Sequence, residues 1–79
     1  MMKEISQIAH SVANELGYEL KKINFKSEHG RKILSIIISK PGGITIKDCE
    51  TFSRKLGPIL DETNIIKEKY YLEVSSPGI

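Results

Sequence analysis

Cysteine and long apolar segments are scarce in this 79-residue sequence, which contains one cysteine, Cys49, and no tryptophan. A single cysteine cannot form an internal disulfide, as is typical of proteins from a reducing compartment. No apolar run approaches the roughly 20 residues that a membrane-spanning helix needs. Lys3, Glu4, Gln7 and His10 also interrupt any apolar segment of a secretory signal. These absences favour a cytoplasmic protein that has no membrane partner.

Groups that could perform catalysis are scarce as well. The two histidines fall in different expected elements, the cysteine lies on an expected buried face, and no two carboxylates suggest an acid/base couple. The sequence contains no phosphate-binding loop, no dinucleotide fingerprint and no Cys/His metal spacing. It therefore predicts a binding module with no catalytic residues, no metal, no cofactor and no small-molecule substrate.

Positive charge is in small excess, with a formal net charge of +2, but it is unevenly distributed. Basic side chains gather in one short stretch: Lys21, Lys22, Lys26, Arg31 and Lys32. A local basic ridge of this kind can contact phosphates. Alternatively, these lysines belong to a solvated hairpin and keep an edge strand from aggregating. The sequence leaves both interpretations open.

Hydrophobic periodicity predicts a helix followed by two strands in the first half of the chain. Apolar residues recur at helical spacing over residues 3–16, and Gly17 can close that helix in a left-handed conformation. Residues 18–27 alternate as a strand, but the phase slips near Lys21-Lys22, which implies a β-bulge. After a short turn, residues 31–39 carry apolar side chains on both faces, as a central strand does.

A turn and a helix start follow directly. Pro41 presets φ for a turn, and the two glycines after it permit left-handed dihedrals. Thr45 can accept an orphan backbone N–H, and Asp48 favours the positive end of the helix dipole. The stretch over residues 40–49 therefore predicts a strand end, a turn and a helix beginning.

The second half predicts one more helix and one more strand. The helix is expected over residues 45–60, with a kink or a restart at Gly57-Pro58 because proline cannot donate to the carbonyl four residues earlier. Cys49 falls on its apolar side and is expected to be a small core residue. A polar connection over residues 62–68 leads to a strand over residues 69–75.

This order of elements predicts an α+β fold: a two-layer α-β-β-α-β sandwich with a three-stranded mixed sheet of order 1-2-3 and both helices on one face. The other face is expected to be open and to expose Ile33, Ile37 and Tyr71, which is typical of a docking surface. Because the second and third strands run parallel, the turns that follow them should lie close together.

Several segments together resemble one known family. They are Gly17 to Leu20, Lys40 to Thr45, Asp48-Cys49-Glu50, Ser53-Arg54, Leu60-Asp61-Glu62 and Tyr71 to Gly78. Across essentially the whole chain, residues 1–79, the sequence is similar to the N-terminal domain of the RimP ribosome maturation factors. It departs from the family pattern at Gly57-Pro58 and at Asn64-Ile65-Ile66.

The resemblance implies a non-catalytic cytoplasmic assembly factor that binds the immature bacterial 30S subunit, contacting 16S rRNA and ribosomal protein S12. It also implies an SH3-like C-terminal domain after the Ser75-Ser76-Pro77-Gly78 motif, which these 79 residues do not include.

For such an assembly factor, we predict two surfaces that contact the ribosomal subunit or the second domain. One is the basic stretch, expected to contact rRNA phosphates. The other is a ribosome or interdomain contact at the two turns: Lys40, Pro41, Gly42, Gly43, Ser75, Ser76, Pro77 and Gly78. These turns could instead serve only as a helix joint and a hinge.

Two rival functions are weaker. A KH-like RNA-binding module needs a GxxG loop between helices, which is missing here. A small acylphosphatase-like enzyme needs an arginine cradle and a positioned asparagine, for which the sequence offers no loop.

Overall fold

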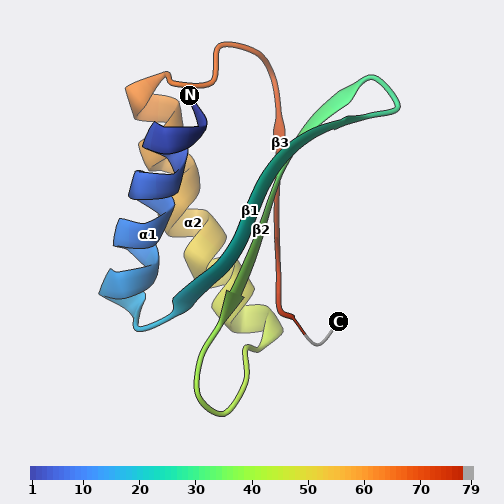
Figure 1. The fold of residues 1–79 in the computed structure, drawn as a ribbon. Helices are drawn as coiled ribbons and strands as arrows, with labels where there is room; N and C mark the ends of the chain where they lie inside the picture. The colour runs from blue at the N-terminus through green and yellow to red at the C-terminus, as the bar shows by residue number, and fades with distance from the viewer. Residues whose placement is uncertain (78–79) are drawn as a thin grey trace.

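The computed structural model describes residues 1–77, which form two helices packed on one side of a three-stranded sheet (Figure 1). The elements are α1 (Met2–Leu16), β1 (Glu19–Glu28), β2 (Arg31–Ser39), α2 (Ile46–Thr63) and β3 (Tyr71–Ser75). The strand order is β1-β2-β3, antiparallel between β1 and β2 and parallel between β2 and β3. The predicted α+β architecture is confirmed.

The core lies between the helices and the sheet, and β2 is its middle strand. Leu34, Ile36 and Ile38 are fully buried, whereas Ile33 and Ile37, between them in the sequence, are only half-buried. Successive strand residues point to opposite faces, so the first three face the helices and the other two face outward. The sheet thus has one covered face and one open face, as predicted.

Local turn chemistry sets the ends of α1 and β1. Gly17 adopts φ 81°, and its N–H donates to the carbonyls of Ala13 and Asn14, which ends α1. The register of β1 against β2 shifts between Leu20 and Lys22, so the bulge predicted from the phase slip is confirmed.

A two-residue turn closes the β1–β2 hairpin. His29 has φ 51° and Gly30 has φ 76°. Positive φ at both central residues is the signature of a type I′ turn, whose twist matches that of the flanking strands.

The α2 helix differs from the prediction at its middle and at its end. It begins with a capping box in which Thr45 and Asp48 each accept the other's backbone N–H. It then continues as one helix through Pro58 to Thr63. Of the predicted kink or restart, the restart is therefore wrong, and so is the predicted end near Leu60. Pro58 is exposed while Leu56 and Leu60 on either side of it are buried. Packing of that apolar stripe holds the helix together where one backbone hydrogen bond is missing.

Two smaller predictions also need correction. The third strand begins at Tyr71 and not at Lys69, because pairing with β2 starts only at the Ile33–Tyr71 register. Cys49 is half-buried and not a core residue, because it lies in the first turn of α2, next to a surface pocket.

Candidate functional site

Strand pairing divides the basic stretch into groups that point in different directions. Alternation along β1 and β2 places Lys22, Lys26 and Arg31 on the open face of the sheet. Lys32 follows Arg31 directly and therefore points to the opposite face. Lys21 is the extra residue of the bulge. The structure thus brings together three of the five predicted phosphate contacts.

The ion pairs of these side chains differ as well. Lys21 lies 3.6 Å from Glu19, and Lys26 lies 4.0 Å from Glu28. Both pairs are exposed, so they contribute little to stability and leave the ammonium groups available to another anion. Within residues 1–77, Lys22 forms no ion pair.

Aromatic and apolar side chains complete the open face beside these cations. Tyr71 is 48% exposed, and the guanidinium of Arg31 lies 5.5 Å from the centre of its ring. In the sheet register, Lys26, Ile33 and Tyr71 form one row across the three strands. The next row holds Asn24, Ser35 and Glu73. This face therefore combines positive charge, hydrogen-bonding groups and an exposed ring.

The turn before α2 is a second candidate surface. The N–H of Gly43 donates to the carbonyl of Lys40 at 2.9 Å, and Gly42 adopts φ 88°. With Pro41 at the second position, these are the features of a type II turn, which requires positive φ at its third residue. Glycine is needed there because a side chain would be strained.

Asp48 ties this turn to the beginning of β1. Its carboxylate accepts the backbone N–H of Thr45 at 2.9 Å and the hydroxyl of Tyr18 at 3.0 Å, and it lies 2.9 Å from the ammonium of Lys40. The Thr45 N–H, the Lys40 ammonium and the Tyr18 hydroxyl together hold the pKa of Asp48 well below its usual range. The helix cap was predicted, but the role of Tyr18 was not, because no local pattern joins residues thirty positions apart.

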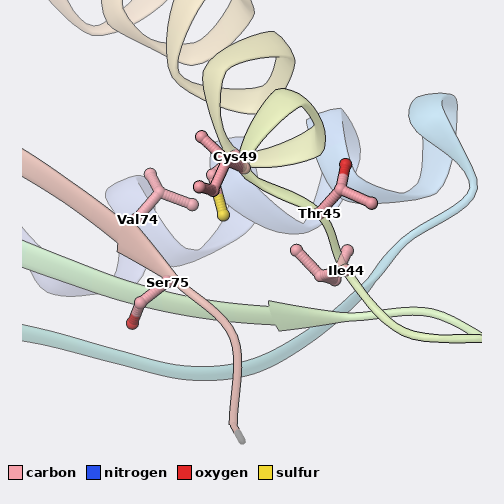
Figure 2. Close-up of a pocket in the computed structure, with 6 residues that line it drawn as sticks. Ile44, Thr45, Cys49, Val74 and Ser75 are labelled. Carbon is pink, nitrogen blue, oxygen red and sulfur yellow. The ribbon is translucent and has the colours of Figure 1, made fainter. Parts of the chain in front are cut away.

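An apolar pocket of about 190 Å³ separates this turn from the end of β3 (Figure 2). Its lining residues are Ile44, Thr45, Ile46, Cys49, Val74 and Ser75. The segments next to the two predicted turns therefore meet at one pocket. Ser76 and Pro77 follow directly, whereas Gly78, the last of the predicted contacts, lies outside the described residues.

The thiol of Cys49 lies at this pocket. The Cys49 sulfur points into the space between Val74 and Ile44 (Figure 2). Burial and the nearby Asp48 carboxylate raise the pKa of this thiol, so it stays protonated at neutral pH. Over residues 1–77, no cluster of three or more histidine, cysteine, aspartate or glutamate side chains could hold a metal ion. Nor is any helix in this range long and apolar enough to cross a membrane.

A family model described as the RimP N-terminal domain matches residues 8–79. The chain belongs to this family. The resemblance drawn from the sequence segments is therefore confirmed, and RimP proteins are ribosome maturation factors. The matched range of this RimP N-terminal domain includes the basic hairpin, the type II turn and the pocket beside β3.

Proposed function

We propose that this RimP N-terminal domain belongs to a non-catalytic cytoplasmic assembly factor that binds the immature bacterial 30S ribosomal subunit and promotes its maturation. The match to the family over residues 8–79 carries this proposal. The surface supports it, because the open sheet face offers cations and an aromatic ring while the pocket holds no reactive group.

A factor without catalytic groups acts by differential binding. It stabilises one conformation of the maturing subunit over its competitors, and the population shift cannot exceed the difference in its affinities for the two states. A gain of 1.4 kcal/mol in affinity for the mature-like state changes their ratio about tenfold. Rigid presentation of the contact residues therefore matters, and the Asp48 network supplies it on the turn side.

The open face is the proposed contact with 16S rRNA. Lys22, Lys26 and Arg31 lie on that face and can meet phosphates of the rRNA backbone. Lys21 and Lys32, which point elsewhere, are proposed to add long-range attraction. Such attraction accelerates association and weakens as salt is added.

The pocket side is the proposed contact with protein. Its lining is apolar, which suits a side chain from ribosomal protein S12 or from an SH3-like domain that follows the Ser75-Ser76-Pro77 motif in the full-length factor. Lys40 is engaged by Asp48 and therefore contributes less to a phosphate contact than the lysines of β1.

Sedimentation with purified 30S subunits, 70S ribosomes and free rRNA tests the proposal. The double variant Lys22→Glu, Arg31→Glu is compared with a matched control, Lys3→Glu, Lys67→Glu, whose exposed lysines lie in α1 and in the connection before β3. Each lost phosphate contact should lower the slope of log affinity against log salt by about 0.7–0.9. We therefore expect the first variant to lose roughly 1.5 from its slope and the control to lose almost nothing. Equal slopes would show that the hairpin is not the contact, and binding to free rRNA or 70S as tight as to 30S would contradict an assembly role.

A further inference from the structure

We propose that the open sheet face binds an unpaired RNA segment, with one base stacked on Tyr71 and the neighbouring phosphates on Lys22 and Lys26. This inference rests on the proposed function and adds to it the form of RNA that the face recognises. Its starting point is the exposure of Tyr71. Among residues 1–77 it is the only exposed tyrosine or phenylalanine, since both phenylalanines and the other two tyrosines are at least half-buried.

A ring held in this way is a stacking platform. Tyr71 is fixed to the sheet by its pairing with Ile33, so the ring stands on a rigid support. Every nucleobase has a π-face, and stacking on an aromatic side chain is the usual way in which proteins hold unpaired bases. The guanidinium of Arg31 lies over one face of this ring, 5.5 Å from its centre, so a base stacks on the other face while Arg31 binds a neighbouring phosphate.

The cations are spaced for the backbone of such a segment. Lys26 lies in the same row as Tyr71, two strands away, which is roughly 10 Å across the sheet. Lys22 is four residues further along β1, or roughly 13 Å. A short extended strand of RNA can therefore cross the face diagonally from the ring to both ammonium groups. The charge on this path complements that of phosphate.

Acidic side chains on the same face favour contact with the bases of the RNA over contact with a continuous line of its phosphates. Glu73 is two residues after Tyr71 on β3, and Glu28 pairs with Arg31 in the row beyond Lys26. Their carboxylates repel phosphate but accept hydrogen bonds from base amino groups. A hollow of about 310 Å³ beside Arg31, lined also by Glu28, His29 and Ile33, leaves room for a second base. Base-paired RNA offers neither an open π-face nor free Watson–Crick edges, so the face suits a single strand.

A direct test uses the 79-residue chain and an eight-nucleotide single-stranded RNA of mixed sequence, with the same sequence in a duplex as the comparison. Tyr71→Leu should weaken single-strand binding about 5- to 100-fold, whereas Tyr71→Phe should retain it because the ring remains. Gln7→Leu serves as the matched control, since Gln7 is exposed on α1, which packs on the other face of the sheet, and its replacement should not change the affinity. The affinity for the duplex RNA should be the same for the unchanged protein and the three variants.

Proton NMR gives a readout that a purely structural role of Tyr71 would not move. On adding the single-stranded RNA, the ring protons of Tyr71 should shift upfield, while those of Tyr18 and Tyr70 stay in place. Circular dichroism melting establishes that each variant is folded before its affinity is measured. Equal affinity of Tyr71→Leu and the unchanged protein, or an unmoved Tyr71 signal at saturation, would overturn the inference.

The outcomes separate this inference from the proposed function. If 30S binding depends on Lys22 and Arg31 while Tyr71→Leu binds as tightly as the unchanged protein, the inference fails and the proposed function stands. If the RNA shifts the NMR signal of the Tyr71 ring but neither the unchanged protein nor any variant binds 30S, the proposed function fails and the inference stands. A Tyr71 shift produced by an added C-terminal half, with none produced by RNA, assigns the face to a protein partner and overturns the inference.

Discussion

Replacing Pro58 with alanine should stabilise the domain, and the structure gives the size of the effect. Pro58 lies inside α2, is exposed, and cannot donate to the carbonyl of Arg54 one turn earlier. Proline in a helix interior costs about 3 kcal/mol relative to alanine. Its restriction of the unfolded chain offsets about 0.4–1 kcal/mol of that cost. We therefore expect Pro58→Ala to raise the free energy of unfolding by roughly 2 kcal/mol, or Tm by roughly 8–16 °C for a domain of this size.

The neighbouring Gly57 refines this expectation. A Cβ added at Gly57 meets no atom within 4 Å outside its chain neighbours, and its φ is not positive. Gly57→Ala should add about 0.5–1 kcal/mol once Pro58 is gone. With Pro58 present the gain should be smaller, because the proline ring clashes with the Cβ of a helical residue before it. The two substitutions should therefore be non-additive in a double-mutant cycle.

Thermal and urea denaturation followed by circular dichroism measure both effects. Pro41→Ala is the control, because Pro41 sits where a type II turn uses its fixed φ. That variant should lose about 0.4–1 kcal/mol, opposite in sign to Pro58→Ala. A Tm for Pro58→Ala that is unchanged or lowered would mean that the proline fits the helix without cost, and the reasoning would be refuted.

Two further expectations follow from the core and from the Asp48 network. Leu34→Ala should cost about 2–5 kcal/mol because its fully buried side chain leaves a cavity, while Ile33→Ala, on the open face, should cost less than half as much; urea unfolding of both variants checks this. The pKa of Asp48 is lower in the folded state than in the unfolded chain, so its contribution to stability is complete above the usual aspartate pKa of about 3.9 and is lost as pH falls below it. Asp48→Asn should therefore flatten the fall of Tm between pH 5 and pH 2 measured by calorimetry, and an equally steep fall in the variant would contradict this assignment.

Most of the fold could be predicted because local patterns and packing agree. Apolar side chains on both faces of β2 identified it as the middle strand, and the phase slip at Lys21-Lys22 identified the bulge. Turn chemistry at Gly17 and at the Pro41 turn marked where elements end. Each of these signals is set by a few neighbouring residues, which is why the sequence alone reveals them.

The errors come from tertiary contacts. Local propensity predicts that Pro58 interrupts α2, but burial of Leu56 and Leu60 in the core outweighs the lost hydrogen bond. The basic stretch looks like one ridge in the sequence, yet strand alternation turns Lys32 to the other face. The hydrogen bond from Tyr18 to Asp48 depends on how distant segments pack together, so no local sequence pattern predicts it.

The bulge at Lys21 makes the length of β1 as important as its composition. On the hairpin side of the bulge, Ile23 and Phe25 point inward, while Lys22, Asn24 and Lys26 point to the open face. Inserting or deleting one residue between the bulge and the His29-Gly30 turn would exchange these two sets, forcing ammonium groups against the helices and apolar side chains into water. The number of residues between the bulge and the turn is therefore constrained as tightly as the order of apolar and polar side chains along it.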